Sequence, residues 1–234
     1  MEIRMAVTKT PKYAVSDSGD SVEIVERPKG GLTAILADGQ GSGTFARITS
    51  NLVVSKAASL ISEGARDGAV ARAVHDYLYA IKNGKVSSTL TIISVDLDTK
   101  SIVVSRNSNC PVIIKKRNDI KILDEYVESI GFHKLMKPSI TEFALAEDLV
   151  IVSFSDGILS AGKKTGLMMT VENIVDLVRE SCPEEIDSLA ETILESAIKM
   201  DKGKPSDDMT VVTVSICPYY DQKKIRRMRV SLPF

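Results

Sequence analysis

Strand-like and helix-like segments follow one another in blocks along this chain, and the order of these blocks constrains the fold more than any other feature. The first block contains three short apolar runs that predict strands, at residues 3–7, 22–25 and 32–37. The second contains two segments with apolar residues at helical spacing, residues 44–62 and 70–81. Grouped strands and helices favour an α+β fold with antiparallel sheets over an alternating parallel one.

The second half of the chain repeats this order. Strands are predicted at residues 90–95, 102–104 and 112–114, which we expect to form a meander, and at 140–145 and 149–154, which we expect to form a hairpin around Glu147 and Asp148. The run at 149–154 is apolar throughout, as expected of a central strand. Two helices, at about 171–179 and after Pro183, and a final strand at 209–216 complete the order. The whole predicts two packed antiparallel sheets flanked by helix pairs.

Composition excludes several classes of protein. The 234 residues include 30 Lys and Arg against 31 Asp and Glu, a formal net charge of −1, which argues against a nucleic-acid binder. The three cysteines, Cys110, Cys182 and Cys217, are far apart and predict reduced thiols in a cytoplasmic protein. The N-terminus has no signal-peptide pattern, and no apolar run approaches the roughly 20 residues of a membrane span. We expect neither a nucleic acid nor a membrane as a partner.

No linker or internal repeat divides the chain. We therefore expect one domain over residues 1–218, followed by a basic tail over residues 219–234 that contains the patch from Lys223 to Arg229. We expect a monomer or a weak dimer. Since the first candidate acidic residue, Asp20, comes so early, the expected layout is a stand-alone domain without a preceding sensor.

Acidic residues stand at the ends of predicted strands, beside small residues: Asp20, Asp38, Asp156, Asp207 and Asp208. An Asp-Gly pair after a strand, taken alone, is most often a tight turn. As a set, however, these carboxylates converge on one small volume if their strands are neighbours, and like charges held close together recruit protons or a divalent cation. Oxygen ligands favour Mg²⁺ or Mn²⁺, and the scarcity of His and Cys agrees with this. Two such ions about 3.5–4 Å apart form a hydrolytic site for phosphoryl groups.

Four motifs carry a family resemblance, in order from Ser18 to Ile216. They are Ser18-Gly19-Asp20-Ser21, Ala37-Asp38-Gly39-Gln40-Gly41-Ser42-Gly43, Phe154-Ser155-Asp156-Gly157-Ile158 and Ser206-Asp207-Asp208-Met209-Thr210-Val211-Val212. At these residues the sequence resembles the metal-dependent protein phosphatases (the protein phosphatase 2C-like, or PPM, family), specifically the bacterial SpoIIE type. The resemblance implies a sandwich of two antiparallel sheets between helix pairs.

The resemblance also implies a ligand set. Asp38 would bridge two ions, with the Gly39 carbonyl on the second, and Asp156 would hold the first together with Asp207 or Asp208. We prefer Asp207, because the family places this ligand three residues before the Thr of the motif. Asp38 and Asp156 would then be catalytic through the water that the ions activate.

Asp20 corresponds to an early aspartate of the family that acts through water or a third, weaker ion. Two positions depart from the family. Gln40 stands where many eukaryotic members have a histidine that protonates the leaving group, and the phosphate-binding arginine has no clear counterpart. Lys9 and Lys12 are the candidates to replace that arginine, and we expect slower catalysis that depends more on the substrate.

The function implied is a Mg²⁺- or Mn²⁺-dependent phosphatase for phosphoserine and phosphothreonine in proteins. Its expected substrates are phosphorylated STAS-domain regulators of a bacterial partner-switching or stressosome pathway. Two alternatives stay open, a sporulation-type phosphatase with another phosphoprotein substrate and a non-catalytic binding module with a phosphatase fold. The helices at 44–82 have an apolar seam that fits either simple core packing or the switch that such helices form in SpoIIE-type relatives.

Overall fold

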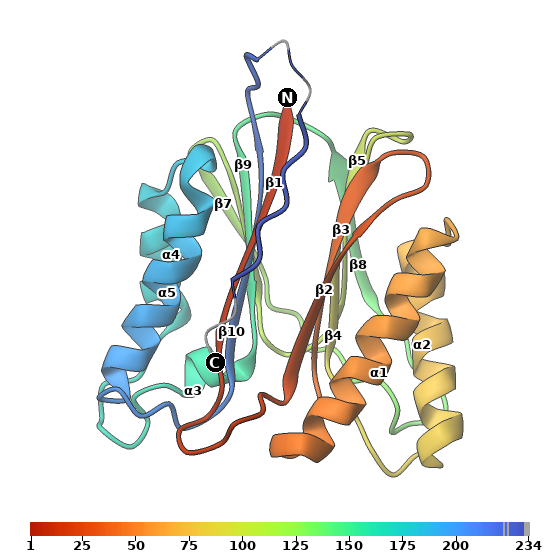
Figure 1. The fold of residues 1–234 in the computed structure, drawn as a ribbon, viewed down its shortest axis with the longest axis vertical. Helices are drawn as coiled ribbons and strands as arrows, with labels where there is room; N and C mark the ends of the chain where they lie inside the picture. Colours follow the sequence, from red (N-terminus) through yellow and green to blue (C-terminus); the bar gives the residue numbers. More distant parts are fainter. Residues whose placement is uncertain (222, 224, 232–234) are drawn as a thin grey trace.

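Two antiparallel five-stranded sheets lie face to face, each covered on its outer side by a helix pair (Figure 1). The structure is a computed structural model and describes residues 1–221, 223 and 225–231. Sheet A has the order β1 (Glu2–Thr10), β10 (Met209–Cys217), β9 (Leu149–Phe154), β6 (Val112–Lys116) and β7 (Asp119–Leu123). Sheet B has the order β2 (Asp20–Glu26), β3 (Gly31–Asp38), β4 (Leu90–Asp96), β5 (Ser101–Asn107) and β8 (Ser139–Ala144). The predicted α+β sandwich is confirmed.

The helices cover the two outer faces. Helices α1 (Gly43–Ser62) and α2 (Asp67–Lys82) lie on sheet B, and α4 (Val171–Glu180) and α5 (Ile186–Met200) lie on sheet A. A short helix α3 (Asp156–Ser160) follows β9 directly, and a 3-10 turn η1 (Pro183–Glu185) precedes α5. Neither α3 nor strand β7 was predicted from the sequence. Among the described residues, no helix combines the length and the apolar character that crossing a membrane requires.

Three apolar layers hold the sandwich together. One lies between the sheets, where Ile93 and Val104 of sheet B share a cluster with Ile151 and Val214 of sheet A. The other two lie between each sheet and its helix pair. Strands β9 and β10 are buried along their whole length because both faces of sheet A are covered. This explains why residues 149–154 are apolar without alternation.

Sequence signals also place the helix ends. Helix α4 begins with a capping box, in which the Thr170 hydroxyl accepts from the Asn173 amide (3.2 Å) and the Asn173 side chain accepts from the Thr170 amide (3.1 Å). Helix α2 ends at Asn83, which adopts a left-handed conformation (φ 51°) just before Gly84. These local devices mark the start of α4 and the end of α2.

Two predicted strand pairings are wrong. β8 and β9 do not form a hairpin, because β8 pairs with β5 in sheet B whereas β9 lies between β10 and β6 in sheet A. The expected meander of residues 90–114 also breaks after β5, since β6 belongs to sheet A. In both places a short connection carries the chain from one sheet to the other. Adjacent strands in sequence suggested hairpins, but β6 pairs with β7 and β9, and β9 also pairs with β10, all within sheet A.

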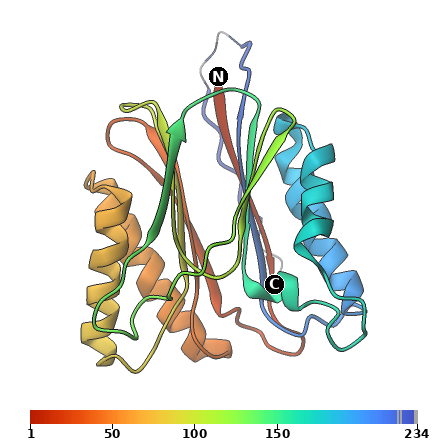
Figure 2. The same cartoon turned by 180° about the vertical axis from the view of Figure 1, so that it is seen from behind.

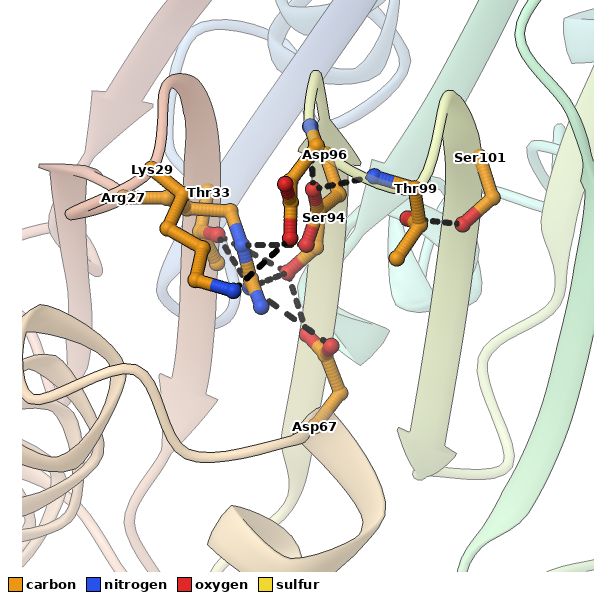
Figure 3. A network of polar contacts seen from close by, with 9 residues as sticks. Arg27, Lys29, Thr33, Asp67, Ser94, Asp96, Thr99 and Ser101 are labelled. Atoms are coloured by element: carbon orange, nitrogen blue, oxygen red, sulfur yellow. Dashed lines mark hydrogen bonds and ion pairs between the residues drawn. The ribbon is translucent and has the colours of Figure 1, made fainter.

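A buried polar network joins the β2–β3 turn to the start of α2 (Figure 3). Arg27 lies between two carboxylates, with its Nη1 atom 3.5 Å from Asp67 and its Nε atom 3.2 Å from Asp96. Its guanidinium also donates to the Ser94 hydroxyl (3.0 Å), which in turn donates to Asp67. The network ties α2 to sheet B at the end of the sandwich away from the predicted metal ligands.

The basic tail is described in part. Lys224 of the predicted patch, as well as Gln222 and residues 232–234, lie outside the described residues. Arg226 forms an exposed ion pair with Glu26 of β2 at 2.8 Å.

Candidate metal centre

The strand ends that carry the predicted ligands meet at one end of the sandwich. Asp20 and Asp38 are direct partners in the register of β2 and β3. In sheet A, β9 ends one residue before Ser155-Asp156, and β10 begins just after Asp207-Asp208. In Figure 1 all four strand ends lie at the lower edge, beside α3 and the start of α1. The fold therefore brings candidate ligands that are far apart in the sequence, from Asp20 to Asp208, to the same end of the sandwich.

A hydrogen bond between two side chains connects the two sheets at this end of the sandwich. The hydroxyl of Thr210, in sheet A, donates to the carboxylate of Asp20, in sheet B, at 2.6 Å. Thr210 is held in turn by Ser155, whose hydroxyl accepts from the Thr210 amide at 3.0 Å. Both residues belong to the recognised motifs, but their supporting role was not predicted. The available signal in the sequence was that Ser155 and Thr210 stand within two residues of a motif aspartate.

Asp207 and Asp208 have different environments. Asp208 is buried, and its two carboxylate oxygens accept from the amides of Lys12 (3.0 Å) and Gly19 (2.9 Å). Asp207 is half-buried, and one of its oxygens accepts from the Asp208 amide at 3.0 Å. Asp208 is thus engaged with the backbone through both oxygens, whereas Asp207 keeps an oxygen for a ligand.

Two glycines allow backbone segments to approach the centre closely. A Cβ atom on Gly39 would lie 2.1 Å from the Ala46 carbonyl oxygen, and one on Gly157 would lie 1.9 Å from that of Asp208. Gly39 therefore lets α1 contact the Asp38 turn, and Gly157 lets α3 contact the 207–208 turn. Among the described residues, none donates a hydrogen bond to the Gly39 carbonyl. That oxygen is available to a cation.

Burial, and to a smaller extent mutual repulsion, raises the pKa of these carboxylates. Burial is the largest cause for Asp38, and the charges of the neighbouring aspartates add to it, which together bring its pKa to about 8. Burial also raises the pKa of Asp20 to about 7, although the hydrogen bond from Thr210 opposes this. Asp156 remains partly accessible to solvent, and burial followed by the charge of Asp207 raises its pKa as well. Mutual repulsion of this kind is relieved by protons or by cations.

The residues fit a divalent cation that keeps part of its water shell. Within the described part of the chain, no three His, Cys, Asp or Glu side chains are gathered tightly enough to hold an ion unaided. The carboxylates nevertheless lie close enough to perturb one another, and a free carbonyl stands beside them. Mg²⁺ is bound through few protein oxygens and several waters, and Mn²⁺ accepts the same ligand type.

Gln40, Lys9 and Lys12, which concern the two positions where the sequence departs from the family pattern, lie beside this centre. The Gln40 side chain accepts from the amide (2.9 Å) and the hydroxyl (3.2 Å) of Ser87. Lys9 is exposed, and its Nζ atom donates to the Asp20 carbonyl at 3.3 Å. Burial lowers the pKa of this lysine, against the raising effect of the Asp20 charge. Lys12 contacts Asp208 through its backbone amide, so Lys9 has the better placed ammonium group.

Neither histidine takes part in the centre. His75 is buried in α2, where its Nδ1 atom accepts from the Gly131 amide at 3.1 Å. His133 lies in the loop between β7 and β8, with its Nε2 atom 3.9 Å from a Glu128 oxygen. Both positions agree with structural or solvated histidines, as expected from the sequence.

Comparison with known proteins points to one family. The model of the family "Stage II sporulation protein E (SpoIIE)" matches residues 28–216. The chain is similar to the stage II sporulation protein E of Priestia megaterium, with 25% identity over 201 residues that cover 85% of this chain and 34% of that protein. The chain therefore spans about a third of the length of this relative.

Solved structures share the fold. The PP2C phosphatase domain of SpoIIE from Bacillus subtilis, solved with a fragment of its regulatory domain, superposes with a TM-score of 0.78 at 23% identity, covering 92% of this chain and 64% of that one. The catalytic domain of the serine/threonine phosphatase PstP, in complex with two manganese ions, has a TM-score of 0.72 at 16% identity, covering 92% of this chain and 99% of that one. The sandwich described above is that of PP2C phosphatases.

Proposed function

The chain belongs to the SpoIIE family of PP2C-like phosphatases, and on this basis we propose that it hydrolyses phosphoserine and phosphothreonine in proteins with two Mg²⁺ or Mn²⁺ ions. The observation that carries the proposal is the convergence of Asp20, Asp38 and Asp156 with the 207–208 pair at one end of the sandwich. A non-catalytic module would have no chemical need to hold these repelling carboxylates together.

The proposed ligands come from both sheets. Asp38 and the Gly39 carbonyl are offered from the end of β3, and Asp156 and Asp207 from the ends of β9 and β10. Asp20, held by Thr210, adds charge from the side of β2 and acts through water or a weaker third ion. When bound, the ions neutralise the phosphoryl oxygens and activate the attacking water.

Other side chains position the substrate. Lys9 supplies a cation beside the acidic cluster and is our candidate for contacting the phosphate of the substrate. Gln40 carries no acidic proton and is hydrogen-bonded to Ser87, so the leaving oxygen takes its proton from solvent rather than from residue 40. This supports the expectation of slower catalysis that depends more on the substrate.

We propose phosphorylated STAS-domain regulators of a partner-switching or stressosome pathway as the substrates, on the strength of the SpoIIE-type motifs. The match to stage II sporulation protein E favours a second candidate, a sporulation-type phosphatase with a different phosphoprotein substrate. We further propose a phosphatase domain at residues 1–218 with a basic tail at 219–234, a monomer or weak dimer, and a cytoplasmic location. The free thiols of Cys110, Cys182 and Cys217 are consistent with that location.

The test is hydrolysis of an aryl phosphate with Mn²⁺ and with EDTA. We expect turnover only with the metal, and a loss of more than about 100-fold in Asp38→Asn and Asp156→Asn, because removing a ligand costs more than removing a residue that only supports one. Asp119→Asn, an exposed change at the start of β7, serves as the matched control. Metal-dependent turnover that survives in both ligand variants would overturn the proposal. Phosphorylated STAS proteins, compared with unrelated phosphoproteins, then decide between the two substrates.

A further inference from the structure

A cavity of about 250 Å³ lies beside the Asp38 turn, outside the proposed ligand set. Gln40 and Ser87 line it together with residues of the loop at 124–138, namely Tyr126, Glu128, Ser129, Phe132 and His133. Figure 2 shows this loop, in green, crossing from β7 to β8 at the end of the molecule where the strands of the metal centre terminate. No step of the proposed hydrolysis uses these side chains.

The wall formed by Ser87 is continuous with the metal centre. The next residues, Ser88 and Thr89, both contact the backbone of Asp38, through the Ser88 hydroxyl (2.7 Å) and the Thr89 amide (2.9 Å) to the Asp38 carbonyl. Ser88 also pairs with Ile130 through two backbone hydrogen bonds of 3.0 and 2.9 Å. The Asp38 turn, the 87–89 segment and the 124–138 loop are therefore joined side by side.

Three buried side chains and the exposed Asn109 hold the backbone of the loop in place. Arg106 donates to the Glu125 carbonyl (2.7 Å), Asn107 donates to the Glu128 carbonyl (2.9 Å), and the Asn109 side chain accepts from the Val127 amide (3.2 Å). His75 accepts from the Gly131 amide in the same way. A loop anchored at so many backbone atoms presents its outward side chains in a fixed arrangement, which favours binding.

Those outward side chains are aromatic and acidic. Tyr126 is 79% exposed and Phe132 is 53% exposed, although large aromatic residues are usually buried. The Glu128 carboxylate lies between them in the chain, and the cationic group that it meets among the described residues is His133, which is charged only when protonated. Aromatic faces together with an uncompensated carboxylate complement a cationic side chain, and arginine more than lysine because its planar group stacks on rings.

We propose that this cavity is a specificity site that receives a basic side chain, preferentially arginine, of the phosphoprotein substrate. The inference rests on the proposed phosphatase function and adds the sequence context that the enzyme selects. Gln40 is two residues from Asp38, so the cavity begins within about 7 Å of that residue along the chain. An extended peptide spans about 3.3–3.6 Å per residue, which places the arginine within roughly three residues of the phosphorylated one.

The experiment compares phosphoserine peptides that differ only by Arg, Ala or Glu, placed in turn at each of the three positions on either side of the phosphoserine. With Mn²⁺ and the full chain, we expect Arg to raise kcat/KM about 5- to 20-fold over Ala at one of these positions. Glu128→Gln should bring this ratio close to one, and Glu128→Lys should turn the preference toward Glu. Tyr126→Ala should lower the ratio in part.

Glu142→Gln is the matched control, an equivalent change on the exposed side of β8, and should keep the preference for Arg. Glu128 is exposed, and unchanged melting temperatures establish that its variants fold. No preference for Arg at any position, or the same preference in Glu128→Gln, overturns this inference while hydrolysis of the peptides leaves the phosphatase function standing. A wild-type protein that hydrolyses neither the peptides nor an aryl phosphate overturns both.

Discussion

At the scale of single residues, the pair Asp207-Asp208 shows how neighbours divide structural and chemical roles. Both oxygens of Asp208 accept backbone amides, from Lys12 and Gly19, and thereby hold the segment before β2 against the start of β10. Asp207 lies close enough to Asp38 and Asp156 for its charge to raise their pKa values, and one of its oxygens accepts from the Asp208 amide. Burial and hydrogen bonding, rather than residue type, separate the two roles.

Substitution of each residue should therefore give opposite results. Asp208→Ala leaves the Gly19 amide without its partner, and we expect the free energy of unfolding to fall by about 2–3 kcal/mol. Asp207→Ala should leave metal-free stability nearly unchanged but reduce Mn²⁺ affinity and activity by more than about 10-fold. Urea unfolding in EDTA and calorimetric Mn²⁺ titration measure the two effects. A larger loss of stability in Asp207→Ala than in Asp208→Ala would contradict this division.

The raised pKa values of Asp38 and Asp20, about 8 and about 7, predict a pH dependence for the metal-free protein. Unfolded carboxyls titrate near pH 4, so between about pH 4 and pH 8 the folded state binds more protons than the unfolded state. Stability in EDTA should thus fall as the pH rises through this window. Melting temperatures between pH 5 and pH 8 check this, and Asp38→Asn should show a flatter slope. A wild-type slope no steeper than that of Asp38→Asn would refute the effect.

At the scale of elements, the contacts of α2 and α1 with sheet B matter most. The Arg27 network anchors the beginning of α2, and the close approach of Ala46 to Gly39 anchors the beginning of α1 beside the metal centre. Phe45 and Ile48 of α1 remain exposed near that point, whereas Val53, Ala57 and Ile61 face the sheet. A switch function of these helices stays a prediction beside their role in core packing.

Removing one partner of the buried network should be costly. Asp67→Ala leaves Arg27 with Asp96 as its remaining carboxylate and the buried Ser94 hydroxyl without its acceptor, and we expect the free energy of unfolding to fall by about 2–3 kcal/mol. The exposed pair Lys29–Asp98, in the neighbouring turns, is the natural comparison. Asp98→Ala should cost no more than about 1 kcal/mol. Equal losses in the two variants, measured by urea unfolding, would mean that burial does not govern the network.

At the scale of the whole molecule, the proposed metal centre lies at one end of the sandwich, between the two sheets. Its candidate ligands come from β3 in sheet B and from the ends of β9 and β10 in sheet A, and the Thr210–Asp20 hydrogen bond spans the same junction. A cation bound there contacts both layers at once. Because such a cation would bind only when both sheets are folded, its binding would stabilise the folded state of the whole sandwich.

We therefore expect Mn²⁺ to raise the melting temperature of the wild-type protein. At about 100 times the dissociation constant, the added stability is about 2.7 kcal/mol. Asp38→Asn and Asp156→Asn should lose most of this gain, whereas Asp119→Asn should keep it. Calorimetry with Mn²⁺ and with EDTA gives the comparison, and an equal gain in the ligand variants would place the ion elsewhere.

The sequence by itself determined the helices, most of the strands and the placement of carboxylates at strand ends. These features depend on local periodicity, on capping residues such as Thr170 and on Asp-Gly steps after apolar runs, all of which are encoded within a few residues. The motifs from Ser18 to Val212 also pointed to the family before any pairing was known.

Only the tertiary structure decided which strands are partners and what surrounds each carboxylate. β8 and β9 are neighbours in sequence but belong to different sheets, because each pairs with distant strands and packs against distant side chains. Asp207 and Asp208 are neighbours of the same residue type. What distinguishes them is that Asp208 accepts from the amides of Lys12 and Gly19, which lie far away in the sequence. The cavity beside Gln40 likewise depends on Arg106, Asn107 and His75 holding a remote loop. Such contacts join residues that are far apart in the chain, and a local sequence pattern cannot predict them because it depends on neighbouring residues only.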